Sequence, residues 1–471
     1  MYLVTKEFLD LINRVYPGIN IKQSYRDLMF ILLFGLKCRN DKYEKVLSRK
    51  KIAIIEFGPE QGKIKNEGHH YSCLPFLQAF QRDVMCVNTF TWTRHNYSKK
   101  QARTAIVVFT PEVEQALIEQ SKLLEKGYNK EELYNFKTQT KYNKKMAITD
   151  RKQEEAQVNM IADQFATLEQ KPLLEYLNGL SVNSFSKLTD TINLSLAYIE
   201  AASIQDETKR LYQSKLLHKI YFSPKPLYQP SEKGNTVRIF PYNESMLMLK
   251  RNIRKVLCKG WVEFDLASSQ LAIISKIWNV SYIHDYLISG KSIWKDLCNH
   301  LQINYNDENK KILKTALYSI CFGKSKKKLL LEIEDSFGLS AKFLWMNHHI
   351  IQALFKARSK RVSFIMSRGY IITAQGKQVF VSGKDKREKL NKIRSMLAEE
   401  AQSIEFWLLE PVIDLAKTTK NFIITLWQSD GFSVKFTDKS KEDRWTKRIQ
   451  DVVLARANQL NVPTHLELEI L

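Results

Sequence analysis

Two β-prone segments that meet at an Asp-Gly pair constrain the fold of this chain more than any other feature. Residues 422–427 and 432–436 are rich in aromatic and β-branched residues, which is typical of strands. The connecting QSDG contains Asp-Gly, a favoured pair for tight turns, so the stretch predicts a β-hairpin. Asp430 then has two interpretations. It either suits the turn, or it holds a carboxylate at a sheet end where a metal ion or substrate binds.

A second aspartate lies at a predicted strand-to-helix junction. The segment GWVEFDLASSQLAIISKIW, residues 260–278, predicts a strand over Trp261–Leu266 followed by a helix. Asp265 at this junction could cap the helix, because Asp is favoured at helix N-termini. Alternatively, it could join Asp430 in binding divalent cations, which prefer carboxylate oxygens. A pair of such ions stabilises the attacking and leaving oxygens of a phosphoryl transfer.

Between the two aspartates, residues 307–329 predict a helix with an unusual face. Lys310, Lys314, Tyr318 and Phe322 recur every four residues and so form one slanting stripe. The lysines could hold a triphosphate, and the rings could contact a sugar and a base. The alternative is an ordinary amphipathic helix whose lysines extend into solvent.

The charge balance favours an anionic partner. The chain has 471 residues, with 73 Lys and Arg against 50 Asp and Glu, a net charge of +23. This indicates nucleic acid ahead of a membrane, although solubility or a lysine-rich coding bias would also explain it. The six cysteines include no CxxC pair, which favours a reducing compartment.

Neither a membrane span nor a secretion signal is expected. The longest apolar run, at 29–36, is too short to cross a bilayer. The N-terminus lacks the basic-then-apolar pattern of a signal peptide. We therefore expect a protein of the cytoplasm or an organelle matrix that is not secreted and has no membrane partner.

In order and spacing, these segments resemble the motifs of family A DNA polymerases, which are related to single-subunit phage-type RNA polymerases. Asp265-Leu-Ala-Ser-Ser-Gln270 resembles a strand-end Asp followed by Tyr-Ser-Gln-x-Glu. The stripe from Lys310 to Gly323 resembles Arg, Lys, an aromatic residue and Tyr-Gly at four-residue spacing. Ser429-Asp430-Gly431 resembles His-Asp-Glu or His-Asp-Ser. Weaker similarities lie at 234–241, 369–378, 394–402 and 449–470, so the resemblance covers about 234–471.

The resemblance implies a template-dependent DNA polymerase that adds dNTPs to a primer 3′-hydroxyl. Its partners would be primer–template nucleic acid and dNTPs, and its cofactor two Mg²⁺ ions, with Mn²⁺ as a possible substitute. The implied catalytic residues are Asp265 and Asp430, which would also bind metal together with the carbonyl of Leu266. The implied nucleotide-binding residues are Lys310, Lys314, Tyr318, Phe322, Gly323 and Gln270. The implied primer- or template-binding residues are Arg394, Gln402 and Arg238.

Several positions depart from the family pattern. Gln270 replaces a Glu that excludes ribose 2′-hydroxyls, and Phe322 replaces a Tyr that bonds to that Glu. Gly431 replaces an acidic neighbour, and Lys310 replaces an Arg. Tyr318 predicts ready acceptance of dideoxynucleotides. These changes leave two alternatives to a DNA polymerase open. The first is an RNA-synthesising polymerase or a primase-polymerase, and the second is a catalytically inactive nucleic-acid-binding protein.

The expected fold is α+β and of the right-hand polymerase type, with an antiparallel palm sheet, helical fingers and thumb, and a smaller N-terminal α+β domain. We expect a domain of unassigned role at 1–145, a thumb-like region at 146–235, and palm and fingers at 236–471, with fingers at roughly 300–394. A linker is expected within 137–157. The N-terminal half has no acidic exonuclease motif, so built-in proofreading is not expected.

Three features of residues 1–145 carry further expectations. KIAIIEF at 51–57 and TAIVVF at 104–109 predict buried strands. Aromatic and basic residues interleave at 88–103, which suits base stacking or an exposed strand edge with a basic loop. The histidines at 69 and 70 with Cys73 lack a second ligand pair at zinc spacing, so structural or surface roles are expected. This region could also bind a protein partner.

Overall fold

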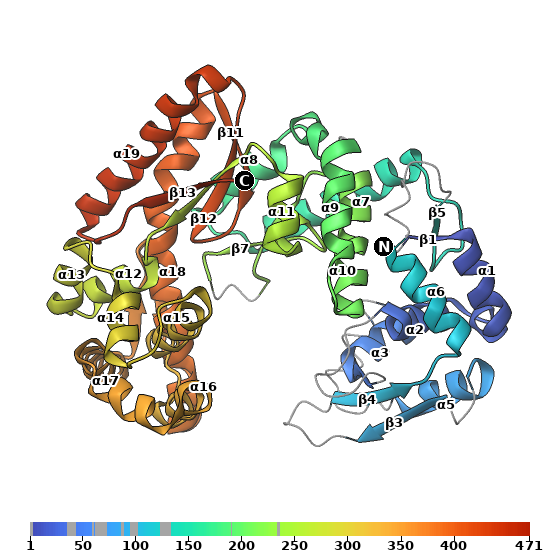
Figure 1. Ribbon diagram of the computed structural model, residues 1–471, viewed down its shortest axis with the longest axis horizontal. Helices are drawn as coiled ribbons and strands as arrows, with labels where there is room; N and C mark the ends of the chain where they lie inside the picture. The colour runs from blue at the N-terminus through green and yellow to red at the C-terminus, as the bar shows by residue number, and fades with distance from the viewer. Residues whose placement is uncertain are drawn as a thin grey trace. The chain divides into compact units, whose positions relative to one another are not determined.

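The C-terminal part of the chain contains a four-stranded antiparallel sheet in the computed structural model (Figure 1). Its strands run in the order β11-β12-β8-β13. They are β8 (Val262–Leu266), β11 (Phe422–Trp427), β12 (Gly431–Phe436) and β13 (Leu466–Ile470). The predicted hairpin and the predicted strand at Asp265 are therefore confirmed, and they are direct neighbours in one sheet.

The structure describes most of the chain. The described residues are 3–34, 44–58, 61, 73–85, 89–94, 102–122, 133–189, 191–232 and 236–471. His69 and His70 lie outside them, as do parts of the segments 88–103 and 234–241.

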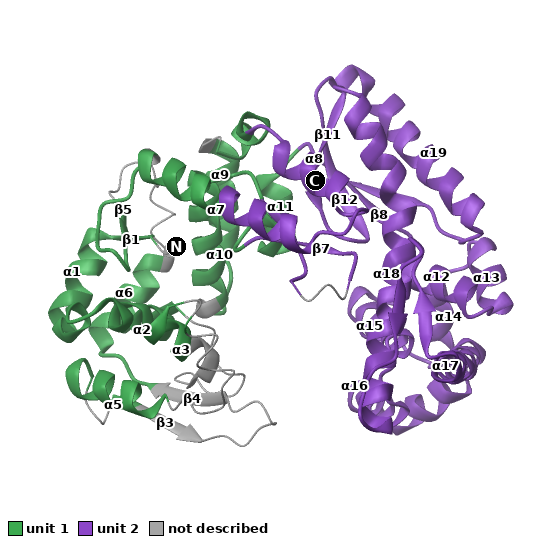
Figure 2. Ribbon diagram, turned by 180° about the vertical axis from the view of Figure 1, so that it is seen from behind, with its two compact units in different colours: residues 1–154, 182–226, 243–259 green, residues 155–181, 227–242, 260–471 purple. Residues whose placement is uncertain are grey.

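Contacts between residues divide the chain into two units, shown in Figure 2. Unit 1 comprises 1–154, 182–226 and 243–259, and unit 2 comprises 155–181, 227–242 and 260–471. The boundary at 154/155 falls inside the stretch expected to hold a linker, but helix α7 (Lys144–Phe165) runs through it without a break. The range expected to be thumb-like is helical and is shared between the two units.

The segment of unit 2 between Asp265 and Asp430 is largely helical, as expected. Its helices are α12 (Ser269–Ile277), α13 (Ser281–Ile288), α14 (Ile293–His300), α15 (Asp307–Cys321), α16 (Lys326–Asn347), α17 (His349–Arg368) and α18 (Lys386–Thr418). A small hairpin of β9 (Tyr370–Ile372) and β10 (Gln378–Phe380) precedes α18. The other elements of unit 2 are α8 (Lys171–Gly179), β6 (Tyr228–Pro230), β7 (Ile239–Pro241), the 3₁₀ turn Lys439–Lys441 and α19 (Glu442–Leu460).

Aromatic side chains pack the sheet and anchor its helices. Phe264 of β8 stacks on Phe432 of β12, with ring centroids 5.3 Å apart. Trp445 of α19 packs on Phe422 of β11 at 5.7 Å. Burial of rings of this size is worth about 1.5–3 kcal/mol each, so these contacts fix the strands that carry the aspartates.

Unit 1 is α+β, as predicted for the N-terminal region. Its sheets are antiparallel, one in the order β2-β4-β3 and one pairing β1 with β5. The strands are β1 (Leu3–Thr5), β2 (Glu44–Ser48), β3 (Phe90–Arg94), β4 (Ala102–Val107) and β5 (Leu133–Asn135). The helices are α1 (Lys6–Val15), α2 (Gln23–Phe34), α3 (Arg49–Phe57), α5 (Leu74–Asp83), α6 (Pro111–Lys122), α9 (Thr191–Ala202), α10 (Glu207–Phe222) and α11 (Arg251–Leu257), with 3₁₀ turns at Pro17–Asn20, Val182–Thr189 and Met246–Met248.

One of the two strands predicted in unit 1 is a helix in the structure. Residues 51–57 belong to helix α3, where Ile52 and Ala53 are fully buried. A short apolar run is compatible with a buried strand or a buried helix, and its periodicity cannot separate the two. The second expected strand, at 104–109, is confirmed over most of its length by β4, the central strand of its sheet. Strand β3 lies at the edge of that sheet.

Among the described residues, no helix combines the length and the apolar character needed to cross a membrane.

Candidate active site at the ends of β8 and β12

Antiparallel pairing brings the two predicted aspartates to the same end of neighbouring strands. Gly431, which follows Asp430, pairs with Asp265, and the N–H of Leu266 donates to the carbonyl oxygen of Asp430 at 3.0 Å. Both aspartates are exposed, whereas the strand residues on either side of Asp265 are buried. The sheet therefore presents two carboxylates to solvent from a rigid backbone.

The structure decides against a helix-capping role for Asp265. Helix α12 begins at Ser269, and its N-cap is Ser268, a residue in the left-handed conformation with φ of 50°. Asp265 lies within strand β8, three residues before that cap. Asp is a favoured residue at helix N-caps, but here the backbone remains extended beyond Asp265, and the N-cap is Ser268.

The turn at residues 428–431 also differs from the expected Asp-Gly geometry. The left-handed residue is Ser429, with φ of 76°, and Gly431 already belongs to strand β12. Gln428 N–H closes the turn by donating to the Gly431 carbonyl at 2.8 Å. Asp430 and Gly431 are therefore not required by the turn type, and another reason must explain the glycine.

Close approach of β12 to β8 supplies that reason. A Cβ on Gly431 would overlap the Asp265 carboxylate and the carbonyl oxygen of Phe264. The Asp265 side chain thus occupies the space in which a side chain at 431 would stand. An acidic residue at 431, as in the family that the chain resembles, would displace Asp265 in this arrangement.

We expect Gly431→Ala to destabilise the protein by about 1–3 kcal/mol, because an added methyl group in a filled space forces backbone shifts. Urea-induced unfolding followed by circular dichroism measures the change. Gly179→Ala is the matched control, since nothing lies within 4 Å of a Cβ at that position. Equal unfolding midpoints for the two variants would contradict the close packing of Gly431 on Asp265.

Helix α15 carries the predicted stripe of lysines and aromatic residues. The helix begins after Asn306, whose side chain accepts from the N–H of Asn309, and Asp307 and Glu308 in its first turn complement the helix dipole. Leu313, Leu317 and other apolar residues form its buried face. Lys310, Tyr318 and Phe322 are half-buried and Lys314 is exposed, so the stripe lies beside this face.

Tyr318 connects the stripe to the strand ends. Burial raises the pKa of the Tyr318 hydroxyl, a hydrogen bond with Ser268 opposes the rise, and the negative charge of Asp430 adds to it. The Nζ of Lys314 lies 5.7 Å from the centroid of the Tyr318 ring. The rings of Trp294 and Tyr318 pack edge to face, with their centroids 6.0 Å apart. The structure therefore brings Lys314, Tyr318 and Asp430 into one region, with Lys310 about 12 Å before Tyr318 along the helix.

The C-terminal end of α15 packs on α18. Phe322 is the C-cap residue, and Gly323 has φ of 80°, a conformation that favours glycine. A Cβ on Gly323 would lie 2.6 Å from Cγ of Arg394, so Arg394 covers this turn. The carbonyl oxygens of Ile320 and Lys324 accept from Arg358, which satisfies the helix end.

Glu405 of α18 is the functional candidate that the sequence reasoning missed. Its side chain is 1% exposed, and its carboxylate accepts from Arg238 at 2.5 Å, from Gln270 at 2.5 Å and from Ser269 at 3.2 Å. Burial raises the pKa of Glu405, Arg238 opposes the rise, and the charge of Asp430 adds to it. Gln270 itself is uncharged, and the carboxyl group next to it belongs to Glu405.

The remaining predicted residues lie around this carboxylate. Gln402, one turn before Glu405, accepts from the hydroxyl of Thr236 at 2.6 Å, and Thr236 in turn accepts from the N–H of Arg238. The hairpin β9–β10 rests on the same helix, because Ala374 N–H donates to Ser403 Oγ at 3.0 Å. Arg238, Gln270 and Gln402 thus belong to one hydrogen-bonded network.

Glu467 adds a further carboxylate that the sequence did not single out. It pairs with Asp265 across β13 and β8, and directly opposed residues of an antiparallel pair point to the same face. Glu467 is exposed. The alternating LELEI at 466–470 indicates a strand, but it does not reveal which strand will lie beside it.

The sequence matches no known protein family and no curated protein. In structure, the chain is similar to the POL domain of Pol1 from M. smegmatis in complex with DNA primer-template and dNTP. The TM-score is 0.44 and the identity 11%, over 67% of this chain and 65% of that one. The chain thus spans about two thirds of that domain. With a similarity of this size, function has to be argued from the side chains of the site.

Proposed function

We propose that this chain is a template-dependent DNA polymerase of family A type that adds dNTPs to a primer 3′-hydroxyl by two-metal phosphoryl transfer. The observation that carries the proposal is the pair of exposed carboxylates, Asp265 and Asp430, at the same end of neighbouring strands. Tyr318 of the lysine-bearing helix lies close enough for the charge of Asp430 to affect its hydroxyl. The net charge of +23 supports a nucleic-acid partner.

The donor set fits Mg²⁺. Asp265 and Asp430 offer hard carboxylate oxygens from a rigid sheet, and Mn²⁺ accepts the same ligands. The carbonyl of Leu266 is a further candidate ligand because it follows Asp265 at the strand end. When bound, such ions supply positive charge to the attacking and leaving oxygens. Strand pairing holds the two carboxylates in place before substrate arrives, which is the property such a site requires.

The helix α15 is proposed to bind the incoming nucleotide. Lys314 and Lys310 would contact the triphosphate as point charges, and the ring of Tyr318 would lie against the sugar. Phe322 and Gly323, at the end of the helix, would lie near the new base pair. In this assignment the fingers are roughly residues 300–394, which include α15–α17, and the four-stranded sheet is the palm.

The network on α18 is proposed to meet the primer–template. Arg238 and Gln402 present hydrogen-bond donors from positions tied to Glu405 and Thr236. Arg394 lies at the α15–α18 contact, where a template strand would pass. Gln270 is 6% exposed and bonded to Glu405, so we propose that it shapes the sugar pocket from beneath and does not move freely.

Other parts of the chain receive broader assignments. The helices within 146–235 are proposed to act as the thumb by contacting duplex phosphates with their basic residues. Residues 1–145 are proposed to recognise a partner, either a protein or a particular nucleic-acid structure.

Primer extension tests the proposed function. A labelled primer on a DNA template, with Mg²⁺, receives dNTPs or rNTPs in separate reactions, and one reaction omits the primer. Extension with dNTPs alone is the expected result. An Asp430→Asn protein serves as the negative control for contaminating polymerases.

The same reactions separate the alternatives. Efficient use of rNTPs, or products without a primer, would replace the proposal with an RNA-synthesising polymerase or a primase-polymerase. The reason for this alternative is Gln270, which stands where the resemblance implies a Glu that discriminates between sugars. Binding to DNA without synthesis in any reaction would overturn the polymerase assignment in favour of a binding protein.

A further inference from the structure

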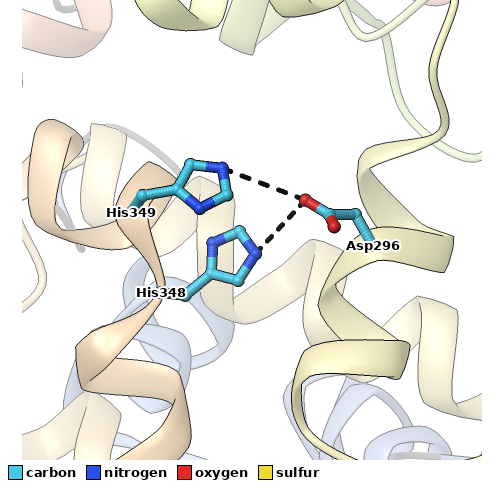
Figure 3. Close-up of side chains that lie close together, drawn as sticks. All are labelled: Asp296, His348 and His349. Atoms are coloured by element: carbon cyan, nitrogen blue, oxygen red, sulfur yellow. Dashed lines mark ion pairs between the residues drawn. The ribbon is translucent and has the colours of Figure 1, made fainter.

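Three potential metal ligands meet in unit 2, apart from the two strand-end aspartates. Asp296 projects from α14, and His348 and His349 lie at the junction of α16 and α17 (Figure 3). Within the described ranges, this is the one group of three or more His, Cys, Asp or Glu side chains whose ligand atoms all lie within 4.8 Å of one another.

The spacing of these atoms matches the ligand shell of a small cation. The Nε2 of His348 is 3.3 Å from Oδ2 of Asp296, and the Nε2 of His349 is 4.0 Å from the same oxygen. Tetrahedral zinc, with ligands at about 2.0–2.1 Å, places neighbouring ligand atoms about 3.3 Å apart. The first separation fits directly. The second closes with a small rotation of His349, whose side chain is 50% exposed.

Two of the ligand atoms lack hydrogen bonds although they are buried. His348 is 1% exposed, and neither its Nε2 nor Asp296 Oδ2 makes a hydrogen bond to a described residue. Their 3.3 Å separation therefore does not reflect a well-aligned N–H···O bond. Buried polar atoms without partners are costly, and a bound cation would satisfy both at once.

Polar groups approach both imidazole rings of the cluster. The Tyr282 hydroxyl lies 2.6 Å from His349 Nε2, where it must move aside or become a fourth ligand. The N–H of Ile350 donates to His348 Nδ1 at 3.3 Å. With a metal on Nε2, Nδ1 would carry the ring proton and could no longer accept this long bond.

We propose that Asp296, His348 and His349 form a Zn²⁺ site that joins helix α14 to the start of α17. Two imidazoles and one carboxylate suit zinc and leave a fourth position for water or Tyr282. Mg²⁺ prefers oxygen ligands, so this site differs in chemistry from Asp265 and Asp430. The role is structural, because a bound ion would fasten helix α14 to the start of α17. The proposal is independent of the polymerase assignment.

Zinc titration of the full-length chain tests this site. The chelator-treated protein is titrated with ZnCl₂ in competition with a chromophoric chelator, and Co²⁺ replaces zinc for absorption spectroscopy. We expect one tight site with tetrahedral Co²⁺ bands and a higher Tm with zinc. His349→Ala and Asp296→Asn should each weaken the affinity at least tenfold and abolish the gain in Tm. His465→Ala, which removes an exposed histidine outside the cluster, is the matched control.

Several results would overturn the proposal. Zinc affinity that is unchanged in both His349→Ala and Asp296→Asn would place the ion elsewhere. Octahedral Co²⁺ bands, or no binding by the wild-type chain at micromolar zinc, would exclude the site. Circular dichroism of the metal-free variants establishes that they are folded. Both variants alter partly exposed side chains, so the buried His348 stays in place.

Discussion

Replacing either strand-end aspartate by asparagine should lower the rate of primer extension by at least about 10²–10³-fold, the size of effect seen when one charge-stabilising group is removed from an active site. Asp265→Asn and Asp430→Asn keep the size of the side chain and remove its charge, so metal affinity falls while packing is retained. Both residues are exposed, and the free energy of unfolding should therefore change by no more than about 0.5 kcal/mol. Single-turnover incorporation of one dNTP measures the rate.

Asp451→Asn is the matched control, because it removes an exposed carboxylate from helix α19. Its rate should equal that of the wild type. Raising the Mg²⁺ or Mn²⁺ concentration should recover part of the activity of the two strand-end variants if metal binding is what they lose. Activity within threefold of wild type in either Asp265→Asn or Asp430→Asn would remove the site from the mechanism.

The elements that carry the site could be predicted because their signals are local. Hydrophobic periodicity identifies three elements as strand or helix: the strand before Asp265, the hairpin around Asp430 and the helix from Asp307. The charge of the chain and the order of these segments favour a nucleic-acid ligand, which stays a prediction. The strand predicted at 51–57 was wrong because a short apolar run has no such periodicity. A helix buries Ile52 as well as a strand would.

What could not be predicted depends on contacts between distant residues. Gly431 is required by the position of Asp265, which lies 166 residues earlier, and no turn rule expresses that contact. Glu405 is bonded to Gln270, 135 residues away. A signal was nevertheless present at Glu405, because a carboxylate among the apolar residues of SIEFWLL needs a partner if the helix is buried.

Glu405→Ala should destabilise the protein by about 3–5 kcal/mol, the usual cost of removing one partner from a buried ion pair. The carboxylate accepts from Arg238, Gln270 and Ser269, and its loss leaves these donors without this acceptor. Arg238 is 29% exposed, so water can recover part of its solvation, and the lower end of the range is expected. Urea-induced unfolding measures the change.

The isosteric Glu405→Gln separates the charge from the hydrogen bonds. The amide oxygen can still accept from Gln270, so stability should fall by only about 1–2 kcal/mol. Primer extension should fall about tenfold or more in this folded variant, because Arg238 loses its charged partner and its position at the proposed primer end. Glu410→Gln, which lies on the same helix and pairs with Arg456 at the protein surface, is the control. A Glu405→Gln protein as active as that control would show that Glu405 serves the fold alone, and that its hydrogen-bonded network does not position the substrate.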